Sequence, residues 1–197
     1  MKRHIAGAIG LVIGVTLLAA CATTKVTSYW KDPGYHKQPH KVLVVAILKK
    51  KEYRTALEDE FALQLNGKGL DVTTGSKAFP ESTPGNKAEL ERYLRGHGYD
   101  SFLLVRIVAW KDLLANNPES GPTWPDFYNM DNDIDALPKT NVKERIATAE
   151  ANLYDAATGK LFWTAATQTP IDGKDHELMA DYVTQVIKQM QSNGLVQ

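Results

Sequence analysis

The stretch "KVLVVAIL", residues 41–48, is a continuous apolar run rich in valine and isoleucine. Strands with one exposed face alternate polar and apolar side chains, whereas an uninterrupted apolar run is typical of a strand buried on both faces. We therefore predict that residues 41–48 form a central strand of a sheet.

After this strand the chain alternates between helix and strand patterns. Leu57, Phe61 and Leu65 recur every four positions until a pair of glycines, which predicts an amphipathic helix. Short apolar runs flank a second segment of helical period, whose apolar positions include Leu90 and Leu94. The predicted elements after the first helix are a strand, a helix and a strand, over residues 70–74, 86–96 and 101–110.

Residues 145–169 alternate apolar and polar side chains on both sides of a turn, which predicts a β-hairpin. Gly159 in the turn can take the positive φ that a hairpin loop often requires. In the first strand Thr148, Glu150 and Asn152 alternate with alanines, so one face of the hairpin is polar. We expect a one-sided sheet whose uncovered face or edge binds a partner.

An amphipathic helix over about residues 175–191 completes the pattern. The order β-α-β-α-β-β-β-α predicts an α/β (α+β) sandwich with a mixed sheet and helices mainly on one face. Because β-α-β crossovers are right-handed, we expect the first two helices to share a face. Residues 41–194 are long enough to form this as a single domain.

The N-terminus has the pattern of a secretory signal peptide: a short basic segment, then an uncharged apolar run over residues 5–20. This run is too short to span a bilayer. It ends in "LAAC", residues 18–21, which resembles the bacterial lipobox, and Cys21 is the only cysteine. The resemblance implies a lipoprotein signal peptide over 1–20 and acyl chains such as palmitate on Cys21. The alternative is an ordinary signal peptide with a cysteine at its end by chance.

Two segments have no periodic pattern. Residues 21–40 are polar and contain turn-forming residues, so we expect a lipidated N-terminus and a tether of about 60 Å at most, with Tyr29 and Trp30 docking part of it on the domain. Residues 111–141 are rich in Asn, Pro and Asp, and loops of this length in compact domains are usually functional or disordered. Three aromatic residues there are the predicted contacts to a partner or ligand: Trp124, Phe127 and Tyr128. Aromatic side chains bury much area at little entropic cost, although they can also fold back over the sheet as a lid.

The composition excludes several classes of function. The chain has 23 basic and 23 acidic side chains, so it has no large basic surface for nucleic acid. With Cys21 acylated no thiol remains for disulfides or catalysis. Phosphate-loop, serine-nucleophile and zinc-protease motifs are absent, and "DNDID", residues 131–135, lacks the glycine and glutamate of a calcium loop. We expect no enzyme activity, no cofactor and no metal.

Two longer stretches carry a resemblance to a known family: "GYDSFLLVRI", residues 98–107, and "NLYDAATGKLFWTA", residues 152–165. They resemble periplasmic lipoproteins related to the curli-secretion channel subunit, the penicillin-binding-protein activator and the Pel exopolysaccharide lipoprotein. The shared residues are a Gly-x-Asp before a hydrophobic strand and a Thr-Gly-Lys turn before an aromatic one: Gly98, Asp100, Thr158, Gly159, Lys160 and Trp163. The resemblance implies this fold and a cell-envelope setting. No loop shows the alternating hydrophobicity of a membrane-spanning hairpin, which argues against a pore.

These observations predict a non-enzymatic lipoprotein that is anchored to the periplasmic face of the outer membrane. Ala22 favours the outer membrane, because an Asp at this position commonly retains lipoproteins at the inner membrane. Its expected role is to bind an envelope protein or to self-associate. The alternative is a glycan or small-ligand module that uses the loop aromatics. A hydrolase built on Glu150 and Asp155 is weaker, because residues five apart on a strand point to opposite faces.

Overall fold

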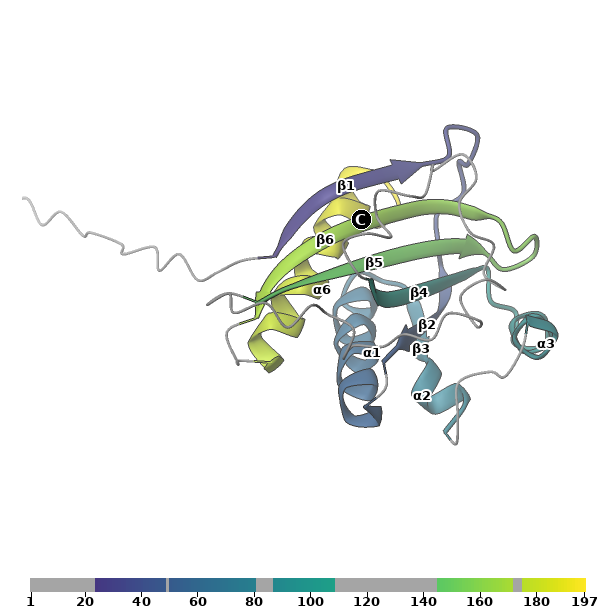
Figure 1. Cartoon of the computed structure of the whole chain (residues 1–197). Coiled ribbons are helices and arrows are strands. Elements are labelled where there is room, and N and C mark those ends of the chain that lie inside the picture. Colours follow the sequence, from purple (N-terminus) through teal and green to yellow (C-terminus); the bar gives the residue numbers. More distant parts are fainter. Residues whose placement is uncertain (1–23, 49, 81–86, 109–144, 172–174) are drawn as a thin grey trace, which may run out of the picture.

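The computed structural model describes residues 24–48, 50–80, 87–108, 145–171 and 175–197. These residues form a six-stranded mixed sheet packed with helices (Figure 1), which confirms the α/β sandwich. The strands lie in the order β1-β6-β5-β4-β2-β3; β2 is parallel to β3 and β4, and the remaining pairs are antiparallel. The strands are β1 (Lys25–Lys31), β2 (Lys41–Ile47), β3 (Asp71–Thr74), β4 (Ser101–Val108), β5 (Arg145–Asp155) and β6 (Leu161–Ile171). The described helices are α1 (Lys51–Asn66), α2 (Gly75–Ala78), α3 (Lys87–His97) and α6 (Asp175–Ser192).

The strand predicted to be central, β2, lies between β3 and β4. Its residues from Val42 to Ala46 are each at most 1% exposed. Val42 and Val44 contribute to one hydrophobic cluster, whereas Leu43 and Val45 contribute to another on the opposite face. The prediction of a strand buried on both faces is therefore confirmed.

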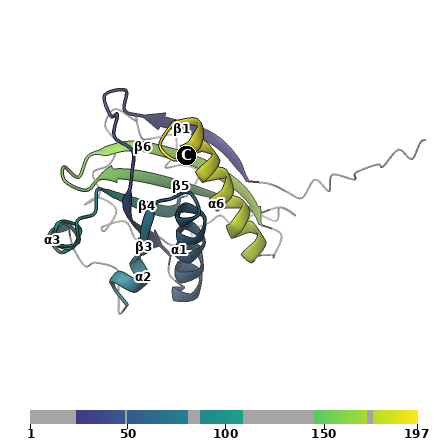
Figure 2. The same cartoon turned by 180° about the vertical axis from the view of Figure 1, so that it is seen from behind.

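The larger hydrophobic cluster lies between the sheet and the helices α1 and α6, which lie side by side in Figure 2. The ring of Phe61 from α1 meets Tyr182 from α6 edge to face, with ring centroids 5.9 Å apart. Trp163 of β6 is fully buried in this cluster, and its indole N–H donates to the Asn193 side chain. This face carries most of the helical packing. None of the helices in the described residues is long and apolar enough to cross a bilayer.

The position of α3 corrects one prediction. Leu90 and Leu94 of α3 pack on the opposite face, against Leu43, Phe102 and Leu104, so the first two crossover helices do not share a face. The reason is the strand order: β3 lies on one side of β2 and β4 on the other. The chain moves outward in the first crossover and back in the second, and two right-handed crossovers in opposite directions place their helices on opposite faces.

The segment assigned to the tether contains a strand. β1 is the edge strand next to β6, in antiparallel register from Lys25 opposite Gln168 to Lys31 opposite Trp163, with an irregularity between Val26 and Ser28. The expected docking of this segment thus takes the form of regular sheet pairing. Residues 32–40 then connect β1 to β2, and in the sheet the strands β6, β5 and β4 lie between these two.

Glu58 of α1, a charged residue outside the predicted Leu57, Phe61 and Leu65 face, is fully buried. Glu58 accepts hydrogen bonds from the Ala46 backbone N–H, at 2.9 Å, and from the backbone N–H and hydroxyl of Ser76. The β2–β3 pairing ends at Val44 opposite Thr74, so the sheet offers the Ala46 N–H no partner on that side. Glu58 supplies the acceptor that a neighbouring strand would otherwise provide, and its hydrogen bonds connect α1 to β2 and α2.

Candidate functional site

The predicted contact residues Trp124, Phe127 and Tyr128 lie outside the described residues, as does the predicted lipid-attachment residue Cys21. They stay predictions. The six residues that carry the family resemblance, by contrast, all lie within the described part. Those before β4 and in the β5–β6 turn meet at one end of the sheet, which we call the turn end.

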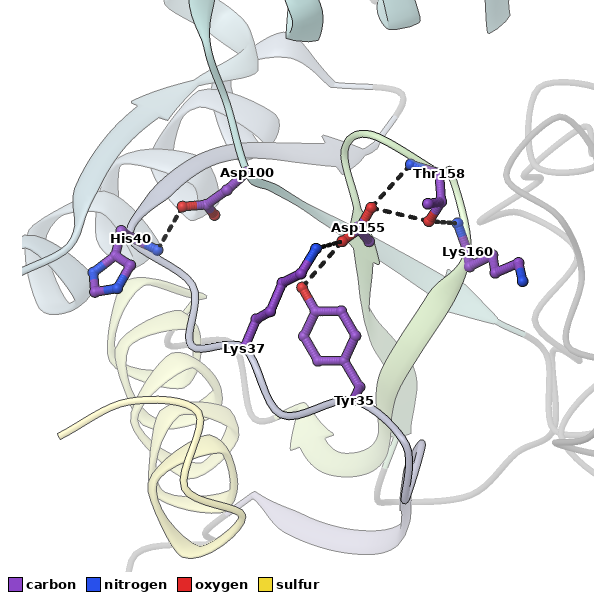
Figure 3. A network of polar contacts seen from close by, with 7 residues as sticks. All are labelled: Tyr35, Lys37, His40, Asp100, Asp155, Thr158 and Lys160. Carbon is purple, nitrogen blue, oxygen red and sulfur yellow. Dashed lines mark hydrogen bonds and ion pairs between the residues drawn. The ribbon is translucent and has the colours of Figure 1, made fainter.

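The connection from β1 to β2 crosses the turn end (Figure 3). The Tyr35 ring stacks on Phe162 of β6, with centroids 3.8 Å apart and planes 9° from parallel. The Lys37 ammonium lies 3.2 Å from the Asp155 carboxylate at the end of β5. The connection is thereby held to each of these two strands as it passes them.

Asp100 holds the next point of the same connection. One carboxylate oxygen, Oδ2, accepts the backbone N–H groups of His40 and Lys41, each at 3.0 Å. The backbone carbonyl of Asp100 accepts the N–H of Ala156 in the β5–β6 turn, at 2.9 Å. The Gly-x-Asp motif therefore positions the start of β2 and joins it to the hairpin, and Gly98 supplies the positive φ, 68°, that precedes it.

Asp155 is the centre of the polar network at the turn end. Its Oδ1 accepts the backbone N–H and the hydroxyl of Thr158, both at 2.9 Å, and its Oδ2 accepts Lys37. Burial opposes the charged form, but the hydrogen bonds from Thr158 and Lys37 outweigh it and lower the pKa of Asp155. Burial, and secondly the nearby Asp155 carboxylate, raise the pKa of Tyr35 to about 12.

This arrangement supports structure rather than catalysis. The Asp155 oxygens and Asp100 Oδ2 accept hydrogen bonds from the turn and from the connection between β1 and β2. Over the described ranges, no three His, Cys, Asp or Glu side chains gather as metal ligands. The motif residues therefore fix the path of the chain from β1 to β2.

We predict that Asp155→Ala lowers the free energy of unfolding by about 2 kcal/mol, because the β5–β6 turn loses the buried, charged acceptor of the Thr158 N–H and hydroxyl. Urea denaturation at neutral pH measures this. Lys37→Ala should cost less than about 1 kcal/mol, since this lysine is largely exposed.

The pH dependence gives a second readout of the same network. The contribution of Asp155 is fully present above its ordinary pKa of 3.8 and is lost as the pH falls through the lowered value. Asp155→Asn should remove this acid-side loss and move the pKa of Tyr35 from about 12 toward its ordinary 10.0. If the Asn variant lost as much stability at acid pH as the native protein, Asp155 would not be the group responsible.

A second surface is the outer edge of β1. Within the described residues β1 pairs only with β6, so its other edge is unpaired there. Tyr29 in the middle of this strand is 57% exposed, one of three large apolar side chains of the described residues that are so exposed. Lys25 and Lys31 stand at the two ends of the strand. An edge strand with an exposed aromatic residue offers a place for another protein to pack.

The polar face of the hairpin differs from the open face expected there. Thr148 and Asn152 are each 4% exposed, and Arg106 of β4 is 1% exposed. Arg106 stands directly opposite Glu150 in the β4–β5 register, and its Nε and one terminal nitrogen lie 3.0 and 2.9 Å from Glu150 Oε2. The two charges compensate each other, which allows this polar row to be buried.

The structure also bears on the weak hydrolase alternative. Glu150 lies on the face of Arg106, whereas Asp155 stands opposite Ser101 and contacts Tyr35 at the turn end. The two carboxylates belong to different faces of β5, as the five-residue spacing predicts. They do not form a paired-acid site.

Tyr35 and Lys37 were not predicted as site residues from the sequence, and Asp155 was considered only as part of a paired-acid hydrolase. A signal was present: "KVTSYW", residues 25–30, is a β-prone run, and "DPG", residues 32–34, is a turn sequence. Asp32 closes that turn by accepting the Gly34 N–H at 2.8 Å. A strand followed by a turn places residues 35–40 over the sheet rather than in a free tether.

Comparison with known proteins identifies the fold. No family model matches the chain, and no curated protein matches it. Among solved structures, a PelC dodecamer from Paraburkholderia phytofirmans is similar with a TM-score of 0.50 and 12% identity, over 85% of this chain and 97% of that one. Lipoprotein GNA1162 from Neisseria meningitidis has a TM-score of 0.42 and 17% identity, over 78% and 99%. At 12% identity the likeness to PelC shows a shared fold.

Proposed function

We propose that this protein is a lipid-anchored, non-enzymatic accessory of the cell envelope that acts by self-association through the outer edge of β1. The observation that carries the proposal is the outer edge of β1, which no strand of the described residues pairs with, and the exposed Tyr29 on that strand. The predicted loop contacts Trp124, Phe127 and Tyr128 belong to the same proposal as a second binding element.

The N-terminal sequence supports the envelope setting. The apolar run that ends in "LAAC" fits processing before Cys21, followed by acylation. More than one acyl chain holds a protein stably on a membrane, whereas one chain alone is marginal. Ala22 after the cysteine favours the periplasmic face of the outer membrane.

The fold supports self-association. The similar PelC structure is a dodecamer, so this fold is compatible with a large homo-oligomer. Symmetric antiparallel pairing of two β1 strands would place Lys25 near Lys31 of the other copy, and like charges opposite each other destabilise a sheet. In this proposal the β1 edge therefore meets a different surface of the next copy, and such head-to-tail contacts form a ring where the rotation between copies closes.

The test is photocrosslinking in intact cells with benzoylphenylalanine in place of Tyr29. We expect adducts at multiples of the mass of the mature chain. The matched control places the same crosslinker at Leu63, which is 68% exposed on α1 and is therefore at least as accessible. Absence of adducts from position 29, or equal adducts from both positions, would refute the β1 contact.

The loop aromatics are tested in the same cells. Replacing Trp124, Phe127 and Tyr128 together with Ala should weaken or abolish capture of the partner copy if the loop takes part in the contact. An unchanged adduct would remove these three residues from the proposal and leave the β1 edge as the contact.

A further inference from the structure

The described chain is fixed to the domain from its first residue. Thr24 is 4% exposed; its backbone N–H donates to the Asp181 carboxylate of α6, and its hydroxyl lies 2.9 Å from the Thr169 hydroxyl of β6. β1 begins at the next residue. The N-terminal segment therefore joins the domain at Thr24 rather than at residue 40.

This junction leaves very little chain between the predicted lipid and the fold. Only three residue steps separate Cys21 from Thr24, and a fully extended chain spans about 10 Å over that length. A tether reaching to residue 40 would have allowed about 60 Å. An acyl group on Cys21 thus holds this end of the sheet at the lipid surface.

The side chains around the junction fit a membrane interface. In the β5–β6 register the Ile146–Pro170 pair lies two residues beyond the level of Lys25, next to the last pair of the sheet, Arg145–Ile171. Ile146 is 51% exposed, although it is a large apolar residue on a strand. Lys25 is exposed near the same end of the sheet, on β1, with β6 between it and the strand of Ile146. Apolar and basic side chains at one end of a domain are the combination that enters the headgroup layer of anionic lipid.

The opposite end of the sheet is then directed away from the membrane. Ile146 and Asp155 are nine residues apart on β5, or about 30 Å at the rise of a strand. β1 runs beside β6 from the Ile146–Pro170 end of the sheet toward the turn end (Figure 1). In this orientation its outer edge points away from the membrane surface along the strand direction. Copies that meet along this edge would be neighbours in the membrane plane.

From this geometry we propose that the domain lies directly on the lipid surface, with the Ile146–Pro170 end of the sheet in the headgroup layer and the turn end about 30 Å above it. The occupant of this surface is an anionic phospholipid bilayer. The inference rests on the proposed acylation of Cys21.

Site-specific fluorescence on the mature lipoprotein tests the proposal. With Cys21 acylated, Ile146→Cys and Thr158→Cys each supply the only free thiol for a nitrobenzoxadiazole label. The labelled proteins are reconstituted in vesicles of phosphatidylethanolamine and phosphatidylglycerol that contain a doxyl-labelled lipid as quencher. We expect a blue shift and loss of fluorescence for the label at 146, and neither for the label at 158.

A variant with a longer tether provides the matched control. Inserting about twenty Gly/Ser residues after Thr23 adds a mean reach of about 25 Å without changing the domain. The quenching at position 146 should then fall while vesicle binding stays complete. Quenching that is equal at 146 and 158 in protein bound to the vesicles would overturn the orientation.

The acylation itself is scored separately. Mass spectrometry of the mature protein and its sedimentation with vesicles, compared with the Cys21→Ser variant, report whether the lipid is present. Loss of vesicle binding in native protein with no acyl mass would refute the anchor, whereas bound protein with an unquenched label at 146 would refute only the position of the domain.

Discussion

Glu58→Ala should destabilise the domain by about 3–5 kcal/mol, one of the two largest effects that we expect from a single substitution. The Ala46 and Ser76 backbone N–H groups and the Ser76 hydroxyl would all lose their acceptor in a site where Glu58 is 0% exposed. Buried donors left unpaired lose their hydration without compensation. Urea or thermal denaturation at neutral pH measures the loss.

The pH dependence of stability identifies the carboxyl group. Burial raises the pKa of Glu58 above its ordinary 4.5, against the opposing effects of its hydrogen bonds and of Arg54. A group with a raised folded pKa contributes stability that is fully present below 4.5 and is lost as the pH rises through the folded pKa. Native stability should therefore decrease on that rise, and Glu58→Gln should not show the decrease.

Two controls separate the carboxylate from simple packing. Glu58→Gln keeps an acceptor for the Ala46 N–H and should cost clearly less than Glu58→Ala. Gly75→Ala probes the space beside the carboxylate, because a Cβ there would lie 2.9 Å from Val45 and 3.0 Å from Glu58. If the Ala and Gln variants at 58 were equally stable, the hydrogen bonds would not be the source of the effect.

Glu58 also shows where sequence patterns succeed and fail. The four-residue spacing of Leu57, Phe61 and Leu65 predicts α1 correctly, since a helix buries residues at that period. The same pattern does not assign Glu58 to the apolar face, yet Glu58 is 0% exposed. The hydrogen-bond donors to Glu58 come from β2 and α2, so the sequence pattern of α1 alone cannot predict them.

The other differences between the predicted and the observed structure also arise from contacts between segments far apart in the sequence. The helix over 87–97 was predicted from its own sequence, but its face depends on which side of β2 receives β4. Likewise, the β-prone run at residues 25–30 does not show which strand it joins, because its partner, β6, lies more than 130 residues later. Local sequence determined the elements here, whereas their neighbours in the sheet determined what each one covers.

The buried ion pair between β4 and β5 gives the second large effect. Glu150→Ala should cost about 3–5 kcal/mol, because it leaves the Arg106 guanidinium, whose side chain is 2% exposed, without its carboxylate. The two residues stand opposite each other on adjacent strands, two residues before β4 ends at Val108. Loss of the pair should therefore also loosen the strand ends that flank residues 109–144.

A double-mutant cycle distinguishes the cost of removing one charge of the pair from the value of the pair itself. Arg106→Leu combined with Glu150→Leu should recover most of the stability lost in Glu150→Ala, because neither charge then remains buried. The Arg95–Glu91 pair on α3, at 3.7 Å with the arginine 62% exposed, is the matched surface control, and Glu91→Ala should cost less than about 0.5 kcal/mol. A double variant as unstable as Glu150→Ala would mean that the polar face needs its charges. The buried row Arg106, Thr148 and Asn152 would then be a polar network that specifies the sheet, rather than a pair that apolar residues can replace.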